Sequence, residues 1–164
     1  VNVAGGFQWQ TLADGDVETW DQLYAMNLRT AVVCCKTVLP AMLARGSGRI
    51  INIGAAAAAR AGAGMGAYAA SKAGVQRLTE SLSDELKNRG ITVNAISPGP
   101  VKTRAASGLK DFDLLLTEAA QRAPLGELVD IMDVGYTCAF LATPYAKRLS
   151  GSTLYVDGGV NIVA

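Results

Sequence analysis

The chain has 164 residues, of which 50% are hydrophobic and 18% are charged, and its formal net charge is +1. This length and apolar content predict one globular domain with a sizeable core and exclude an intrinsically disordered chain. The balanced charge argues against a nucleic-acid-binding surface, and no apolar run reaches the roughly 20 residues of a membrane span. We therefore expect a cytoplasmic protein without a nucleic-acid or membrane partner.

The cysteines are Cys34, Cys35 and Cys138, and the chain has no histidine. No CxxC spacing occurs, and adjacent residues of a helix point to different sides. We expect reduced, largely buried thiols rather than a redox pair, and no metal site.

The first third of the chain predicts a strand end, a long helix and a second strand. Val1–Ala4 is apolar and is followed by a glycine pair, as at the end of a buried strand. Asp16 can cap a helix over residues 17–45, in which Pro40 should introduce a kink or end the regular part. The β-branched run 49–54 is bounded by glycines and predicts a buried strand.

The rest of the chain continues the alternation of helices and strands. The expected elements are a helix over 67–89 that Gly90 stops, a strand over 91–96, helices over 111–122 and 130–141, and a strand over 152–156. This order predicts an α/β fold, with a parallel sheet that carries helices on both faces. Neither an internal repeat nor a linker divides the chain, so residues 1–164 are expected to form one domain.

Tyr68 and Lys72 are the residues that most strongly suggest a reaction. Four residues apart on a helix, their side chains can address one site. A phenol ordinarily has a pKa near ~10, and an ammonium beside it stabilises the phenolate. We therefore expect Lys72 to lower the pKa of Tyr68 toward neutrality and make it a usable acid/base. The spacing alone occurs by chance, but here Asn27 precedes it on a helix and Pro98-Gly99 follows the next strand.

This succession resembles the short-chain dehydrogenase/reductase family, from the first residue to about Gly159. The resemblance implies a partial Rossmann-like, doubly wound parallel sheet whose strands correspond to the family's strands 4-5-6-7. It also implies hydride transfer between NAD or NADP and a small carbonyl, alcohol or imine-type substrate. By the same resemblance Tyr68 is the acid/base, Lys72 lowers its pKa and binds the nicotinamide ribose, and Asn27 holds a water of the proton relay. The implied cofactor contacts are Asn2, Ala4, Gly5, Lys72, Pro98, Gly99, Val101 and Thr103.

Each of these positions also has a purely structural interpretation. Asn27 can be a hydrogen-bonded polar residue of a helix, and Tyr68 taken alone can be a core or interface residue. Pro98-Gly99 taken alone is a turn after a strand. The order of the motifs along the chain favours the catalytic interpretation over these alternatives.

One departure from the family concerns the hydroxyl that steadies the substrate oxygen. The family serine lies thirteen residues before the tyrosine, and Ala55 stands at that place. Alanine neither donates nor accepts, and the loss of one such donor can cost ~10²–10³ in rate. Alanine at this position also resembles the dihydropteridine reductase-like branch, which implies a pteridine-like or otherwise activated substrate.

The second departure concerns the phosphate-binding segment. A dinucleotide fold begins with a strand, a glycine-rich turn and a helix, whereas Gly62, Gly64 and Gly66 follow the strand at 49–54 and lead into Tyr68. We therefore expect a truncated dinucleotide-binding domain that lacks the N-terminal cofactor-binding half. Such a chain should bind the cofactor weakly and have little or no activity alone, and its choice between NAD and NADP cannot be read.

The resemblance also implies a homo-oligomer through the helices near 17–45 and 67–89, where Ala69, Ala70 and Ala73 allow close helix approach. The short apolar edge at Val1–Ala4 is a further place where chains can pair. A non-enzymatic alternative therefore stays open, in which the chain is a pseudoenzyme or a dimerising scaffold. The substrate is not indicated by the sequence, because residues 109–122 carry no distinctive polar group pattern.

Overall fold

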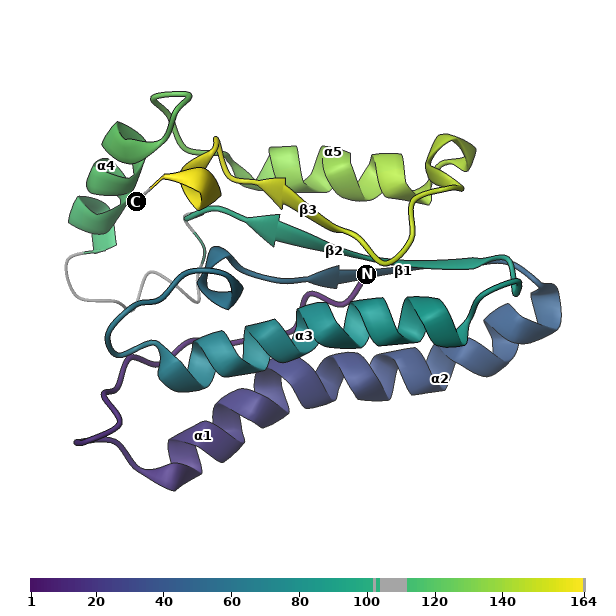
Figure 1. The fold of residues 1–164 in the computed structure, drawn as a ribbon, viewed down its shortest axis with the longest axis horizontal. Helices are drawn as coiled ribbons and strands as arrows, with labels where there is room; N and C mark the ends of the chain where they lie inside the picture. Colours follow the sequence, from purple (N-terminus) through teal and green to yellow (C-terminus); the bar gives the residue numbers. More distant parts are fainter. Residues whose placement is uncertain (102, 104–111, 164) are drawn as a thin grey trace.

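The computed structural model describes residues 1–101, 103 and 112–163. At its centre lies a parallel sheet with the order β1-β2-β3, formed by β1 (Gly48–Ile53), β2 (Ile91–Pro98) and β3 (Thr153–Val156) (Figure 1). Asn2 adds an isolated parallel bridge to Asn52 on the outer side of β1. The spatial order is therefore N-terminal stub, β1, β2, β3, as the resemblance to family strands 4-5-6-7 implies.

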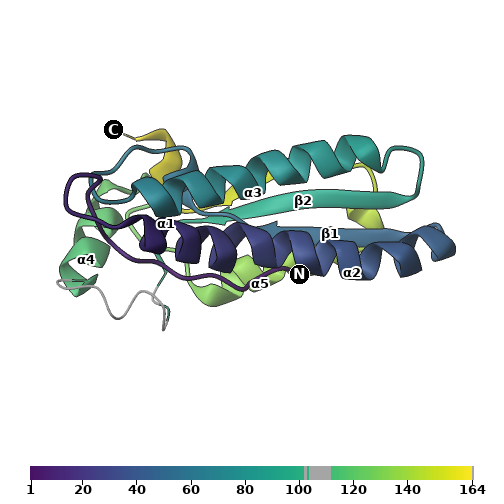
Figure 2. The same cartoon turned by 90° about the horizontal axis from the view of Figure 1, so that it is seen from below.

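Helices cover both faces of this sheet, which confirms the α/β class. One face carries α1 (Val17–Tyr24), a π-helical turn η1 (Ala25–Arg29), α2 (Thr30–Arg45) and α3 (Gly66–Glu85), and the other carries α5 (Ile131–Ala142) (Figures 1 and 2). α4 (Phe112–Arg122) lies beyond the carboxyl ends of the strands. Short 3₁₀ turns complete the chain: η2 (Ala56–Ala58), η3 (Pro144–Ala146) and η4 (Val160–Ile162).

Two hydrophobic clusters hold the layers together, one on each face of the sheet. The cluster under α2 and α3 consists of Cys35, Ile50, Leu82, Leu86, Ile91 and Val93. The cluster under α5 includes Ile51, Ile96, Leu141 and Ala146. Neighbouring residues of one strand, such as Ile50 and Ile51, belong to different clusters because side chains alternate across a sheet. The β-branched strands are buried on both sides, which fits a parallel sheet.

Helical structure is present over 17–45 as expected, but it is interrupted at a different residue than expected. Regular helix gives way to the π turn at Ala25–Arg29, whereas α2 continues through Pro40 to Arg45. The expectation that Pro40 would end the regular helix was therefore wrong. Pro40 and Lys36 are both exposed, so the carbonyl group of Lys36 that Pro40 cannot pair lies on the solvent side. The π turn has another cause, because the side chain of Asn27 occupies the carbonyl oxygen of Leu23.

Other local expectations are confirmed or corrected by side-chain contacts. Asp16 caps α1 by accepting from the Thr19 amide at 2.6 Å, as predicted. Cys35 is buried, but Cys34 is exposed, so the expectation of largely buried thiols was wrong for Cys34. In the described part of the chain no helix is long and apolar enough to cross a bilayer.

Candidate active site

The carboxyl ends of the three strands form the edge at which the predicted site residues meet. The registers pair Ile53 with Ile96 and Pro98 with Val156, so the strands end side by side. The Gly54 amide continues the ladder to the Ile96 carbonyl at 2.7 Å, and the Gly99 amide reaches the Val156 carbonyl at 2.9 Å. In an open parallel sheet this edge is where ligands bind.

Tyr68 and Lys72 lie together at this edge, as their spacing predicts. Both belong to the first half of α3, and the Lys72 Nζ is 5.9 Å from the centroid of the Tyr68 ring. The Lys72 Nζ donates to the carbonyl oxygen of Ile53, the last residue of β1, at 2.9 Å. That bond fixes the ammonium between the start of α3 and the end of β1.

The protonation of this pair differs from the expectation. Burial raises the pKa of Tyr68 to about 12, so the prediction that Lys72 brings it toward neutrality was wrong for the structure described. Burial also lowers the pKa of Lys72 to about 8, because only 5% of this residue is exposed. Desolvation therefore outweighs the attraction between the two groups at this separation and shifts each pKa in the direction that favours the neutral form, although Lys72 remains largely an ammonium at neutral pH.

Asn27 is buried beside Tyr68 and Lys72, and both the nitrogen and the oxygen of its side-chain amide are hydrogen-bonded. Its Nδ2 donates to the carbonyls of Leu23 and Gly6 at 2.9 and 3.0 Å, and its Oδ1 accepts from the Gly6 amide at 3.1 Å. A Cβ on Gly5 would lie 2.7 Å from the Asn27 Oδ1 and 3.5 Å from the Lys72 Nζ. Asn27 therefore brings the glycine turn after the N-terminal stub against Lys72.

The predicted cofactor contacts in the N-terminal segment divide into two groups. Ala4 and Gly5 are exposed at the edge of the sheet. Asn2 instead points inward, where its Nδ2 donates to Asn52 Oδ1 at 2.7 Å and contacts Cys35 Sγ at 3.4 Å. Its backbone pairs with Ile51 and Ile53 of β1. Asn2 thus anchors the segment, while Ala4 and Gly5 are the part a ligand can reach.

The predicted contacts after β2 lie at the same edge. Pro98 ends the strand, and Gly99, Val101 and Thr103 follow it with partial exposure. A Cβ on Gly99 would lie 2.9 Å from the Cα of Asp157, so only glycine lets this turn pass the end of β3. These residues follow the carboxyl end of β2, at the same edge of the sheet where Lys72 meets the end of β1. Residues 109–111 of the sequence region expected to cover the site lie outside the described residues.

Ala55, at the place of the family serine, lies two residues beyond the end of β1. Its backbone is extended (φ −163°, ψ 154°) and it immediately precedes η2. The short run Ala56–Ala58 adds only methyl groups. This part of the edge is apolar and offers a substrate no hydroxyl.

A cavity of about 320 Å³ opens next to the Tyr68 ring environment. It is lined by Gly5, Gly6, Phe7, Gln8, Gln22, Leu23 and Met26. Phe7 joins it to the tyrosine, because the Phe7 and Tyr68 rings meet edge to face with centroids 5.1 Å apart. A larger cavity of about 650 Å³ lies between residues 124–129, α5 and β3, and Tyr68 is not among its lining residues. The larger cavity is therefore separate from Tyr68.

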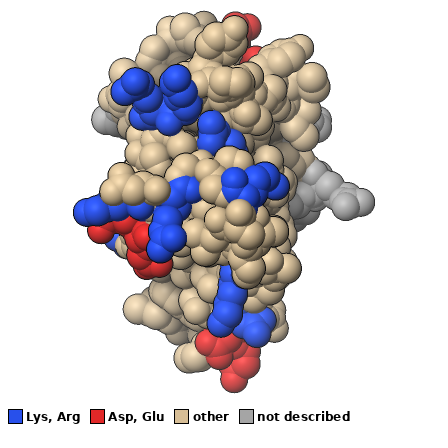
Figure 3. All heavy atoms as spheres, turned by 90° about the vertical axis from the view of Figure 1, so that its right-hand side faces the viewer, with Lys and Arg blue, Asp and Glu red and all other residues tan. Residues whose placement is uncertain are grey.

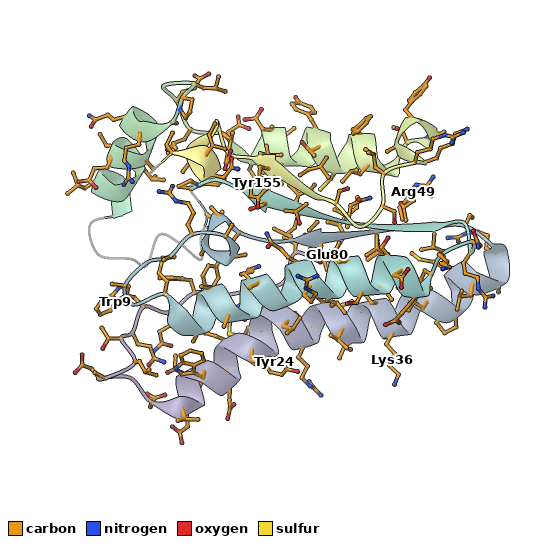
Figure 4. All side chains as sticks on the ribbon, viewed as in Figure 1. Trp9, Tyr24, Lys36, Arg49, Glu80 and Tyr155 are labelled. Carbon is orange, nitrogen blue, oxygen red and sulfur yellow. The ribbon has the colours of Figure 1, made fainter. Side chains whose placement is uncertain are left out.

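Sequence reasoning missed the aromatic loop that supports this arrangement. Trp9 Nε1 donates to the Ala63 carbonyl at 3.1 Å, and the Gln10 amide donates to the Gly64 carbonyl at 3.0 Å. These bonds fasten the loop after the glycine turn to the approach of α3, where Figure 4 shows Trp9. The signal was the pair of aromatic residues, Phe7 and Trp9, directly after the glycines. Within the described ranges no group of three or more His, Cys, Asp and Glu side chains could hold a metal ion.

Comparison with known proteins identifies the family of the chain. Residues 1–161 match the family model described as Enoyl-(Acyl carrier protein) reductase. A 3-oxoacyl-[acyl-carrier-protein] reductase of Vibrio cholerae is 36% identical over 163 residues, which cover 99% of this chain and 66% of that protein. The chain thus spans about two thirds of the length of the curated relatives that it matches.

Solved structures give the same answer for the fold. A gluconate 5-dehydrogenase from Burkholderia cenocepacia, in complex with NADP and tartrate, has a TM-score of 0.89 at 29% identity, covering 98% of this chain and 63% of that one. A structure described as a short chain dehydrogenase/reductase family protein has a TM-score of 0.87 at 34% identity, covering 99% of this chain and 66% of that one. Together with the placement of Tyr68, Lys72 and Asn27 at one sheet edge, these matches show that the chain belongs to the short-chain dehydrogenase/reductase family.

Proposed function

We propose that the chain is the catalytic part of an NAD- or NADP-dependent oxidoreductase that uses Tyr68 as its acid/base. The observation that carries this proposal is the position of Lys72, a buried amine beside Tyr68 whose described hydrogen-bond acceptor is the Ile53 carbonyl. An ammonium has three N–H donors. Two of them thus remain for groups that arrive with a ligand, such as the hydroxyls of a nicotinamide ribose.

The surrounding residues fit the nicotinamide end of such a cofactor. Gly5 packs against the side chain of Asn27, and Gly99 packs against the main chain of Asp157. A Cβ on either glycine would come too close to these neighbours. Glycine at both positions therefore lets the two turns pack closely at this edge, beside which this proposal places the nicotinamide ring. Lys72 would hold the ribose, with Gly5, Pro98, Gly99, Val101 and Thr103 around the ring and its phosphates. When bound, the cofactor supplies or accepts the hydride.

Residues of the chain itself would transfer the proton. Because burial keeps Tyr68 protonated, it is poised to donate to a substrate oxygen or nitrogen during reduction. The phenolate that remains lies beside Lys72, whose ammonium stabilises it. Asn27 acts as a positioning residue, since its amide holds Gly6 and thereby the turn at Gly5. The relay water that the resemblance implies for Asn27 remains part of this proposal.

The proposed substrate is a small carbonyl or imine compound that is already activated. Ala55 gives no hydroxyl to the developing oxyanion, so a substrate that disperses its own charge, as a pteridine-like ring does, suits the site better than a simple ketone. The 3-oxoacyl thioesters implied by the relatives' names are the main competing class. We expect the reaction to take place in the cytoplasm.

The 164-residue chain alone is expected to bind the cofactor weakly. It presents no glycine-rich strand, turn and helix for the pyrophosphate, and it spans about two thirds of its curated relatives. Fluorescence titration with NADH and NADPH tests this expectation. Saturation by either cofactor in the micromolar range would contradict it.

The test of the function is turnover of quinonoid dihydropteridine, a simple ketone and a 3-oxoacyl thioester at millimolar cofactor. It is made on this chain and on any longer protein encoded by the transcript upstream of Val1. We expect turnover in the longer protein at least, and its loss in the Tyr68→Phe variant with an unchanged circular dichroism spectrum. Turnover that survives Tyr68→Phe would overturn the proposal. Turnover of the ketone without the pteridine would reject only the substrate class.

A second candidate function is a dimerising scaffold, and one observation favours an assembly of this kind. α2 exposes the apolar side chains of Val32, Val33, Val38 and Leu43 to between 39% and 47%. We propose that copies of the chain pair through the helices near 17–45 and 67–89. In a scaffold the Tyr68→Phe variant would keep both its assembly and its biological effect.

A further inference from the structure

The end of the molecule opposite the catalytic edge carries a concentration of positive charge. Six cationic side chains define this basic end: Arg45, Arg49, Lys87, Arg89, Lys147 and Arg148. They come from the end of α2, the start of β1, the turn after α3 and the segment after η3. Figure 3 shows Lys and Arg side chains gathered over this end, with smaller groups of acidic side chains among them.

Hydrogen bonds tie these separate segments into one surface. The Gly48 amide donates to the Gly90 carbonyl at 3.2 Å, which joins the turn after α2 to the turn after α3. Ser150 Oγ lies 2.6 Å from Ser83 Oγ and accepts from the Val93 amide at 3.1 Å. The loops that carry the cations are thus packed at the amino ends of the strands, and Figure 4 labels Arg49 there, far from Trp9.

The charges at this end are not neutralised by ion pairs. The salt bridge found in the described residues joins Arg77 and Glu80, and none of the six cations makes one there. Asp84 and Glu85, at the end of α3, are the acidic groups nearest in the sequence to this surface. A protein with a net charge of only +1 thus gathers six cations on the segments at one end.

We propose that the basic end docks on an anionic lipid surface, in contrast to the expectation from net charge and hydropathy that the chain has no membrane partner. The two cavities described above both lie away from this end. Its cations stand on several loops rather than along one helix or groove, which suits a flat partner. Tyr145 is 88% exposed beside Lys147 and Arg148, and Leu43 is 41% exposed near Arg45. Amphipathic tyrosine next to basic residues is typical of membrane interfaces, where Lys and Arg are attracted to anionic headgroups.

Docking at this end would leave the Tyr68 edge facing away from the lipid. The inference therefore does not depend on the proposed reaction, and its test needs no turnover. The chain is sedimented with vesicles of phosphatidylcholine containing 30% phosphatidylglycerol and with vesicles of phosphatidylcholine alone. We expect binding to the anionic vesicles only, and its loss at high salt, since exposed charges are screened.

Charge reversal identifies the surface responsible. The Lys87→Glu/Arg89→Glu variant should lower the vesicle partition coefficient at least tenfold. The matched variant Arg29→Glu/Lys36→Glu changes net charge equally on exposed helical positions away from this end and should retain most of the binding. Equal loss in both variants, or no binding to anionic vesicles, overturns the proposal. Retention on duplex DNA without vesicle binding would assign the surface to nucleic acid instead and also overturns it. Circular dichroism verifies that both variants fold.

Discussion

The side-chain amide of Asn27 makes two hydrogen bonds to the backbone of Gly6: its Nδ2 donates to the Gly6 carbonyl, and its Oδ1 accepts from the Gly6 N–H. Because Asn27 is only 2% exposed, these bonds are made away from water. Replacing it by alanine should lower the free energy of unfolding by about 2–4 kcal/mol, from lost bonds and unpaired buried groups. Urea unfolding measures this loss, with Gln22→Ala as the exposed control on the same helix. If the Gly6 amide hydrogen exchanges at the same rate in Asn27→Ala as in the wild type, Asn27 does not hold Gly6 in place.

The glycine at position 5 should resist even the smallest side chain. A Cβ there would lie 2.7 Å from Asn27 Oδ1 and 3.5 Å from Lys72 Nζ. We expect Gly5→Ala to lower the free energy of unfolding by about 1–3 kcal/mol, the range for overpacking a filled site. Gly135→Ala is the control, because open space surrounds a Cβ at that position of α5. It should stabilise by about 0.5–1 kcal/mol, as alanine does in a helix. Equal effects of the two changes in thermal unfolding would count against the close approach.

The buried amine of Lys72 makes stability depend on alkaline pH. Its pKa falls from 10.5 to about 8 on folding, so between these values the unfolded chain holds a proton that the folded chain has released. Stability from this residue therefore rises as pH increases through that window and is lowest below pH ~8. Relative to a Lys72→Met variant, the protein should gain about 1–2 kcal/mol between pH 7.5 and 9.5. The two unfolding free energies should be measured across this range, and parallel curves would contradict the lowered pKa.

A buried chain of polar side chains predicts a further loss of stability. Asn2 donates to Asn52, whose Nδ2 donates to Thr79 Oγ1 at 2.9 Å, and Asn52 and Thr79 have no exposed surface. Thr79→Val removes the acceptor and leaves a buried amide donor unpaired, which should cost about 1–3 kcal/mol. Thr37→Val is the matched control, an exposed threonine of α2 that also donates to the carbonyl four residues before it. A Thr79→Val variant as stable as the control variant in urea would show that water replaces the bond.

The exposed apolar face of α2 predicts a change of assembly. Val33 and Val38 are 47% and 40% exposed on a helix that would lie at the interface. We expect light scattering to show a dimer or larger assembly. The Val33→Glu/Val38→Glu variant should be shifted toward the monomer, because assembly would bury its unpaired carboxylates in the interface. Ile131→Glu, at an exposed position of α5 outside these helices, is the control. A wild-type chain that is monomeric at high concentration would contradict the interface.

The sequence predicted the elements well because each carries a local signal. The β-branched runs at β1 and β2 gave the strand boundaries within about two residues, Asp16 marked the start of α1, and α3 began one residue before the expected start. α3 ends at Glu85 with its cap at Leu86, so the expectation that Gly90 stops this helix was wrong. The π turn at Asn27 could not be foreseen, since it depends on a side chain binding a carbonyl of its own helix.

The proximity of Tyr68 and Lys72 was predictable from the sequence, whereas their protonation was not. Spacing placed Tyr68 and Lys72 together, but the direction of the Tyr68 pKa depends on burial that spacing does not reveal. The roles of Phe7 and Trp9 were also hidden, because their partners Tyr68 and Ala63 lie more than fifty residues away in the chain. Long-range contacts of this kind leave no periodic pattern to read.

Glycine follows the end of each segment that reaches the carboxyl edge: Gly5 after the stub, Gly54 after β1, Gly99 after β2 and Gly158 after Asp157 at the end of β3. A Cβ at Gly5, Gly99 or Gly158 would come within 3.0 Å of Asn27, Asp157 or Glu127, so a larger residue fits these turns only by displacing a neighbour. The shape of the carboxyl edge is therefore set by how closely the turns pack behind it. A methyl group added at one of these glycines would affect a bound molecule indirectly, by shifting the turn beside it.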